Sequence, residues 1–216
     1  MDNEGEFEAQ LEPELVPVVC VNCATEFDHE PWPQTCPRCQ HPIDLQAQFA
    51  YCRGHNAFTV GQELIMKVYP TKRKKRLPTV IEKEGLQDYM QAYTSLQRAF
   101  QGALAESQRQ LSIRMMAAIA QVFQYNTMVS PLEAIYWSTL LVELNSHLEL
   151  VSLREKLAKN NHRGLITFLQ SWRGRVRLRQ LEKALAMLES KLDLLEHRIG
   201  FTQPMHTRIK KEPLRR

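Results

Sequence analysis

The chain has 216 residues, of which 44% are hydrophobic, enough to bury one ordinary core or a small module beside a larger one. This composition excludes an intrinsically disordered chain, and its apolar runs fall far short of the roughly 20 residues that cross a bilayer, so we expect a globular protein without a membrane span or secretory signal. The formal net charge is only +4 and the sequence pI is about 8.8, so total charge alone does not indicate a nucleic-acid-binding protein.

Residues 1–16 are acidic. They contain no Lys or Arg, and their acidic side chains are Asp2, Glu4, Glu6, Glu8, Glu12 and Glu14. A segment of this composition buries too little apolar surface to fold, so we predict a disordered acidic tail. The remainder of the chain is correspondingly more basic.

Four cysteines lie in two closely spaced pairs. Two residues separate Cys20 from Cys23, twelve residues follow, and the same spacing recurs in Cys36 and Cys39. Four thiolates complete the tetrahedral shell of zinc and leave no corner for a water, so we predict one structural, non-catalytic Zn²⁺ ion. The odd total of five cysteines also suits a reducing compartment better than a disulfide framework, and we expect a cytoplasmic protein.

Residues 17–60 resemble the zinc-ribbon superfamily through these two CxxC pairs. The resemblance implies that each pair lies on a knuckle at the tip of a β-hairpin and that both knuckles share one zinc ion. Knuckles of this superfamily often carry Gly after the second cysteine, whereas this chain has Ala24 and Gln40. Zinc ribbons occur in transcription, translation and protein-docking factors, so the resemblance predicts the metal and leaves the function open.

The next two stretches, residues 48–54 and 56–70, contain many β-forming residues in rough alternation, with turn-forming residues from Gly54 between them. We predict a β-hairpin that extends the ribbon into a module over 17–69. Cys52 and His55 form a CxxH pair within it. The pair could ligate a second metal, but no further pair lies in reach, so an ordinary half-buried cysteine and a turn histidine are favoured.

Residues 70–84 contain a basic run bracketed by Pro70 and Pro78, which indicates a linker between two modules. The run consists of Lys72, Arg73, Lys74, Lys75 and Arg76. It could be a solvated connector or a segment that contacts phosphates, and we favour phosphate contact because such a run loses little by ordering on an anionic surface. Residues 201–216 form a second basic segment, a predicted tail that carries Arg208, Lys210, Lys211, Arg215 and Arg216.

Helical periodicity dominates residues 85–200. We predict three long helices, over about 86–125, 131–159 and 165–199, joined by short loops that favour antiparallel neighbours. The predicted fold class is therefore mainly α with a small β module: a four-cysteine zinc ribbon followed by an elongated antiparallel three-helix bundle or coiled coil.

Two local signals refine these helices. Ser130 and Glu133 have the spacing of a capping box, with Pro131 at the first helical position, which predicts a well-defined start of the second helix. Gly102 and Ser107 could bend the first helix.

The last predicted helix carries an apolar seam whose members are spaced alternately by three and four residues: Leu178, Leu181, Leu185, Leu188, Leu192, Leu195 and Ile199. Such a seam is typical of a coiled coil. It could lie wholly in the core or leave an apolar strip for a second copy or another protein, and core packing is favoured.

The segment "SWRGRVRLRQ" places four arginines two residues apart. Positions two apart on a helix diverge by about 200°, so Arg173 and Arg177 share one face while Arg175 and Arg179 share another. One pair could reach phosphates with Trp172 nearby to stack a base, and the other would be solvated or paired with Glu149 or Glu155. Simple solvation and ion pairing of all four are equally consistent with the pattern.

The sequence contains no phosphate-cradling glycine loop, no GxSxG and no HExxH motif, so we expect a protein without enzymatic activity. Two function classes remain. The first is a subunit of a larger complex that binds DNA or RNA independently of sequence through its basic segments and docks through its helices. The second is an adaptor whose ribbon and helices 86–199 bind proteins, including a second copy of the chain, without nucleic acid.

Overall fold

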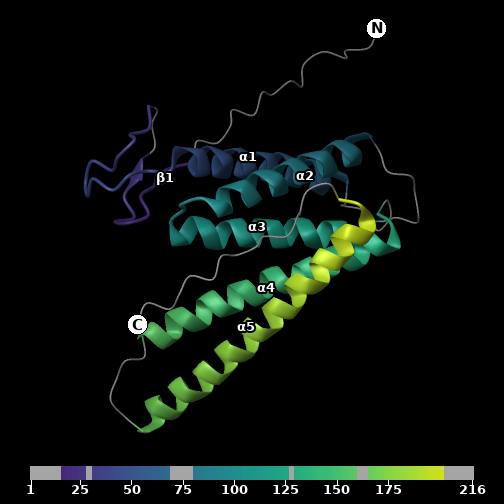
Figure 1. The fold of residues 1–216 in the computed structure, drawn as a ribbon. Helices are drawn as coiled ribbons and strands as arrows, with labels where there is room; N and C mark the ends of the chain where they lie inside the picture. Colours follow the sequence, from purple (N-terminus) through teal and green to yellow (C-terminus); the bar gives the residue numbers. More distant parts are fainter. Residues whose placement is uncertain (1–15, 28–30, 69–79, 127–128, 160–164, 202–216) are drawn as a thin grey trace.

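A computed structural model describes residues 16–27, 31–68, 80–126, 129–159 and 165–201 (Figure 1). Within these residues the chain forms one two-stranded sheet and five helices. The strands are β1 (Val18–Val19) and β2 (Glu26–Phe27), and the helices are α1 (Leu45–Val68), α2 (Val80–Gln101), α3 (Glu106–Tyr125), α4 (Pro131–Lys159) and α5 (Leu165–Ile199). The predicted fold class, mainly α with a small β module at a four-cysteine cluster, is confirmed.

The predicted β-hairpin over 48–54 and 56–70 is wrong, because its described part, residues 48–68, belongs to helix α1. Its buried positions recur at helical spacing, through Ala47, Tyr51 and Ile65. Gly54 lies on the packed face and not in a turn, since a Cβ at this position would lie 2.7 Å from Leu96 Cγ. The Asp44 carboxylate caps the helix by accepting a hydrogen bond from the Ala47 N–H at 3.1 Å. His55 is therefore a helical residue, and the ribbon-like part ends before residue 45.

The helix predicted over 86–125 is two helices, α2 and α3, separated at residues 102–105. α2 also begins at Val80, inside the segment predicted as a linker. The break begins at Gly102, and the Asp44 carboxylate accepts the Ala103 N–H at 3.0 Å. One carboxylate therefore caps the start of α1 and stabilises the turn after α2.

The second and third predicted helices correspond to α4 and α5. At the start of α4 the Glu133 carboxylate accepts the Ser130 N–H at 2.7 Å, and the Ser130 hydroxyl accepts the Glu133 N–H at 3.2 Å, which confirms the capping box. α5 ends at Ile199 and is followed by Gly200 with φ +81°.

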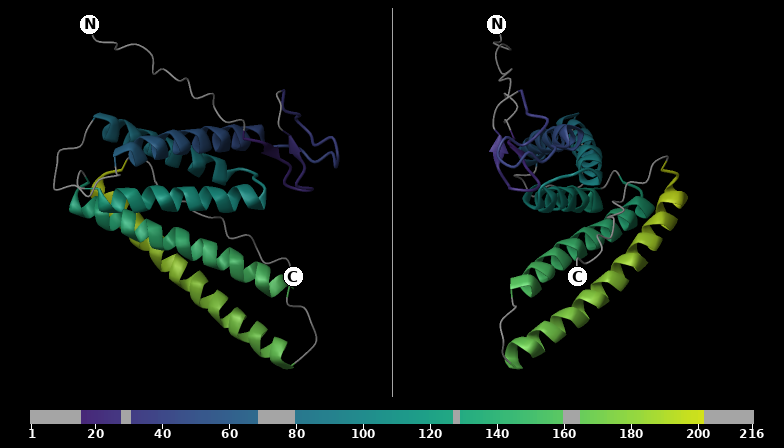
Figure 2. Two further views of the ribbon diagram at one scale, coloured as in Figure 1. Left: turned by 180° about the vertical axis from the view of Figure 1, so that it is seen from behind. Right: turned by 60° about the vertical axis from the view of Figure 1, so that its left-hand side comes forward.

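The predicted three-helix bundle is confirmed only in part, since the described residues contain five helices, two of which are the predicted second and third. α1 pairs with α2, α3 lies beside them, and α4 packs on α3. The core is continuous from α1 to α5, and its fully buried members include Tyr93, Leu96, Met116, Ile119, Leu140, Leu144 and Leu192. Figures 1 and 2 show α4 and α5 running together away from the other helices toward the end where α4 stops and α5 begins. There the pair has a small core of its own around Leu150, Leu181 and Leu185.

Candidate metal centre

The four paired cysteines converge on one point. Cys20 Sγ lies 3.6 Å from Cys39 Sγ, and Cys23 Sγ lies 3.5 Å from Cys36 Sγ. All four sulfur atoms lie within 4.8 Å of one another, and none is in a disulfide. Each close contact therefore joins one cysteine of the first CxxC pair to one cysteine of the second. Four thiolates at these separations could hold one metal ion.

Two loops of matching geometry present these cysteines. In the first, the Ala24 N–H donates to the Cys20 carbonyl at 2.9 Å and the Cys20 N–H donates to the Thr25 carbonyl at 2.9 Å. In the second, sixteen residues later, the Gln40 N–H donates to the Cys36 carbonyl at 2.7 Å and the Cys36 N–H donates to the His41 carbonyl at 2.9 Å.

The flanking pairings repeat as well. β1 pairs with β2 through Val19 and Glu26, and an isolated antiparallel bridge joins Thr35 to Pro42. The two loops are therefore the same structural unit used twice, facing each other across the sulfurs. We name residues 16–44 without the undescribed 28–30 the four-cysteine module.

Ala24 and Gln40 both have a positive φ, of 54° and 57°. These are the positions at which knuckles often carry glycine. The N–H of each left-handed residue donates to the carbonyl of the first cysteine of its loop, and a side chain in this conformation costs about 1 kcal/mol.

We expect Ala24→Gly to stabilise the metal-loaded protein by up to about 1 kcal/mol, because relief of the backbone strain exceeds the entropy that glycine adds to the unfolded chain. Ala184→Gly is the matched control, since Ala184 is an exposed residue within α5, and it should destabilise by about 1 kcal/mol. Urea unfolding of the two variants measures whether each substitution raises or lowers the free energy of unfolding. Destabilisation by Ala24→Gly would show that the positive φ carries no strain.

The sulfurs differ in their surroundings. The Thr25 hydroxyl lies 3.0 Å from Cys23 Sγ, and its hydrogen bond lowers the pKa of this thiol to about 6. A hydrogen bond from the Asn22 side chain lowers the pKa of Cys39, whereas burial raises the pKa of Cys20 to about 11. Cys23 and Cys39 therefore favour the thiolate form that binds metals.

The four-cysteine module is fixed to the helices by two buried glutamines. The side chains of Gln48 on α1 and Gln108 on α3 are 0% and 3% exposed and exchange two hydrogen bonds, at 3.0 and 2.9 Å. Gln48 Nε2 also donates to the Val19 carbonyl, and Gln108 Nε2 donates to the Pro17 carbonyl, both at 3.4 Å. The outer edge of β1 is thus satisfied by amide side chains from two helices. Sequence reasoning missed this pair because no local pattern marks it.

Cys52 and His55 do not join the cluster. Both lie on α1, and the Cys52 thiol donates to the Val16 carbonyl at 3.6 Å. Burial raises the pKa of Cys52 to about 11, so this residue stays a thiol. Among the described residues the only group of at least three potential ligands is the four paired cysteines.

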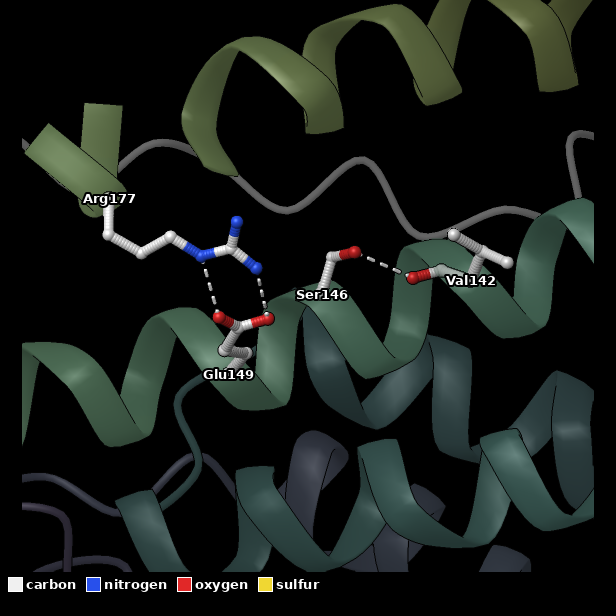
Figure 3. A network of polar contacts seen from close by, with 4 residues as sticks. All are labelled: Val142, Ser146, Glu149 and Arg177. Carbon is white, nitrogen blue, oxygen red and sulfur yellow. Dashed lines mark hydrogen bonds and ion pairs between the residues drawn. The ribbon is translucent and has the colours of Figure 1, made fainter. Parts of the chain in front are cut away.

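The four predicted arginines of α5 separate into distinct environments. Arg177 Nε donates to Glu149 Oε1 at 2.9 Å and its second donor reaches Glu149 Oε2 at 3.3 Å, which bridges α5 to α4 (Figure 3). The hydrogen bond to Glu149 raises the pKa of Arg177. The prediction that an arginine of this segment pairs with Glu149 is confirmed, whereas Glu155 accepts from Gln110 at 2.8 Å.

Arg175 and Arg179 lie on the other face, beside Trp172. Together with Val176 they line a shallow hollow of about 170 Å³ on the surface of α5. The Trp172 side chain is 55% exposed. Arg173 is also exposed but does not line this hollow. The basic run Lys72, Arg73, Lys74, Lys75 and Arg76 and the basic segment 202–216 lie outside the described residues.

The apolar seam of α5 faces the core, as predicted. Leu178, Leu181, Leu185, Leu192 and Leu195 are buried, while Leu188 and Ile199 are partly buried. A second set of apolar residues lies on the opposite face of the same helix, with Val176, Met187 and Leu194 exposed by 37%, 74% and 55%. Sequence reasoning did not single out this outer set because a methionine and two aliphatic residues seven and eleven positions apart form no continuous seam.

A group of polar side chains is buried between α2, α4 and α5. The Tyr136 hydroxyl donates to Glu196 Oε1 at 2.7 Å, and Glu143 and Tyr93 are fully buried. Burial raises the pKa of both tyrosines and lowers the pKa of His147, whose Nε2 lies 3.9 Å from Glu143 Oε1, to about 4. His147 is therefore neutral at pH 7. The group joins α4 to α5 in the core and was not predicted.

Among the described residues, none of the helices combines the length and the apolarity that crossing a bilayer requires. No protein-family model, curated protein or solved structure matches the chain.

Proposed function

We propose that the four cysteines bind one structural zinc ion. Bonds of about 2.3 Å from a tetrahedral zinc place its sulfur ligands about 3.8 Å apart, close to the 3.6 and 3.5 Å of the two nearest pairs. With all four positions taken by sulfur, the ion has no open site for a substrate or a reactive water, so its role is to hold the two loops together.

We further propose that the chain is a non-enzymatic nucleic-acid-binding subunit of a larger complex. The observation that carries this proposal is the hollow on α5, which the exposed Trp172 lines together with Arg175 and Arg179. An aromatic face that can stack on a base, with guanidinium groups nearby that can bind phosphates, is the combination that sequence-independent single-strand binders use. The basic run 72–76 would add phosphate contacts of the same kind.

Trp172→Ala should weaken binding to a random single strand by about 1–3 kcal/mol, since one stacked base is lost.

Arg179→Ala should reduce the dependence of binding on salt more than Arg177→Ala, because Arg177 is already paired with Glu149. These two variants remove the same formal charge and are matched controls for each other. Replacing Lys72, Lys74 and Arg76 with alanine should lower the salt slope by at most about three units. Fluorescence anisotropy over a salt titration measures each effect.

The outer face of α5 favours a second candidate, a protein-docking adaptor. Val176, Met187 and Leu194 lie within about 20° of one another around the helix and are exposed. An apolar strip on this face suits a partner helix better than a polyanion. Absence of any binding to single strand or duplex at micromolar protein and low salt would reject the nucleic-acid proposal in favour of the adaptor. The double variant Met187→Ser with Leu194→Ser should then abolish association of the chain with its partner helix while leaving the fold intact. Sedimentation measures this association.

A further inference from the structure

The side of α5 opposite its buried leucines combines positive charge with apolar side chains. Between residues 173 and 198, eight positions lie within about 40° of Met187 around the helix, and all eight side chains are exposed. We name this set the cationic face: Arg173, Val176, Gln180, Lys183, Met187, Lys191, Leu194 and Arg198. The face is roughly 38 Å long. It lies at the edge of the molecule, because α4 lies between α5 and α3 (Figure 2).

The cationic face contains no acidic residue. The four acidic residues of α5 lie at least about 120° from Met187 around the helix, and they are Glu182, Glu189, Asp193 and Glu196. Two of them make contacts with α4, since Glu182 pairs with Arg154 at 3.3 Å and Glu196 accepts the Tyr136 hydroxyl. Within the described part of the chain, none of the four cations of this face is in an ion pair. Their charges are therefore available to an anionic partner.

The apolar residues of the face narrow the choice of partner. A nucleic acid would neutralise the cations and leave Met187 and Leu194, which are 74% and 55% exposed, in water. A partner helix packs best on a seam with an apolar residue at every third or fourth position. Met187 instead lies eleven positions after Val176 and seven before Leu194, and the positions between them on the face are occupied by Gln180, Lys183 and Lys191.

The surface of an anionic bilayer offers both kinds of contact in one plane. Separate apolar side chains can enter the boundary between headgroups and acyl chains without forming a continuous seam. The apolar stems of lysine and arginine lie along this boundary while their charged ends reach the lipid phosphates. A long helix with basic and apolar residues on one exposed face is typical of a protein that binds a membrane surface.

We propose that the cationic face of α5 docks on an anionic lipid surface. Met187 and Leu194 enter the headgroup region, and Lys183, Lys191 and Arg198 contact the lipid phosphates. The helix then lies parallel to the membrane, with α4 between the membrane and α3. This inference goes beyond nucleic-acid binding and does not rest on it.

Co-sedimentation of the full, zinc-loaded chain with lipid vesicles tests the proposal. Vesicles of equal parts phosphatidylserine and phosphatidylcholine should bind the chain, and binding should weaken as salt is raised. Vesicles of phosphatidylcholine alone should bind it at least about tenfold more weakly. Lys183→Ala, Lys191→Ala and Arg198→Ala should each weaken binding to the anionic vesicles about fivefold, because one lysine or arginine near such a surface contributes about 1 kcal/mol.

The apolar contacts are tested by Met187→Ser with Leu194→Ser, which should weaken binding to the anionic vesicles about tenfold or more. The matched control is Ile135→Ser with Val142→Ser. These two residues of α4 are also seven positions apart and are exposed by 49% and 53%. The control should leave vesicle binding unchanged. Because all four side chains are exposed, both double variants should keep the helical content of the parent chain, which circular dichroism measures.

Absence of binding to the anionic vesicles at low salt would overturn the proposal. It would leave the nucleic-acid proposal standing, since Trp172, Arg175 and Arg179 are not substituted in any of these variants. Equal weakening by the control pair on α4, or full binding by the serine pair on α5, would show adsorption without docking of this face and would also overturn it. Self-association that only the serine pair on α5 removes, without vesicle binding, would assign the face to a second copy of the chain instead.

Discussion

Removal of the proposed zinc ion by a strong chelator is expected to unfold the four-cysteine module while α1–α5 stay folded. The module has two strands of two residues each, and its fully or nearly fully buried apolar side chains are few, chiefly Val18, Val19, Cys20 and Cys36. So little buried surface cannot offset the entropy of ordering the loops. Metal binding would supply on the order of 10 kcal/mol of the folding free energy, and the helices retain a separate core.

Cys36→Ser is expected to have the same effect, because Cys36 is fully buried and a hydroxyl is a poor zinc ligand. Cys52→Ser is the matched control: Cys52 lies on α1 outside the cluster, and this variant should keep one metal per chain. Metal content by elemental analysis and amide NMR of residues 16–44 measure the two effects. A module that stays folded after chelation, or purified protein without stoichiometric zinc, would contradict the metal centre.

The metal ligands could be predicted from sequence because their chemistry is local. Each CxxC pair is one tight loop, so the spacing of Cys20 and Cys23 already determines that both sulfurs face the same point. The same is true of the Ser130–Glu133 capping box, in which three residues of separation fix both hydrogen bonds. Interactions between residues that are only three positions apart therefore leave a pattern that can be recognised in the sequence.

Helix α1 could not be predicted in this way, because its sequence carries two competing signals. β-forming residues and Gly54 indicated a hairpin, yet Gly54 and Gly61 are needed for close helix packing: added Cβ atoms would lie 2.7 Å from Leu96 and 2.8 Å from Tyr89. Glycine at a helix–helix contact and glycine in a turn look alike in sequence. Only the partner helix α2, which is distant in the chain, decides between them.

The same limit applies to α5. Its buried seam was evident from the spacing of the leucines, but the sequence did not show which arginines of α5 would form an ion pair with α4. Arg177 and Glu149 are 28 positions apart in the sequence, so their contact depends on the antiparallel alignment of α4 and α5. Arg175 and Arg179 lie beside Trp172. Tertiary packing therefore divided a symmetric run of arginines into one structural ion pair and one candidate binding face.

Gln108→Leu is expected to destabilise the metal-loaded protein by about 3 kcal/mol, because it removes hydrogen-bond partners from polar groups at a buried junction. The Gln48 amide loses its reciprocal hydrogen bonds, the Ala105 N–H loses its acceptor and the Pro17 carbonyl loses its donor. Gln48→Leu should cost a similar amount of stability, since Gln108 then loses its reciprocal hydrogen bonds and the Val19 carbonyl loses its side-chain donor. Urea unfolding of both variants measures the cost.

The double variant distinguishes a coupled pair from two independent contacts. Once one amide is gone the other has lost its partner already, so replacing both should cost less than the sum of the single changes by about 1–2 kcal/mol. Gln110→Leu is the matched control on α3: Gln110 is partly exposed and bonds to Glu106 and Glu155 near the surface, so its loss should stay within about 0.5 kcal/mol. Strict additivity of Gln48 and Gln108 would contradict the coupling. Because the pair holds β1 on the helices, each single variant should also release zinc faster to a competing chelator, whereas Gln110→Leu should not.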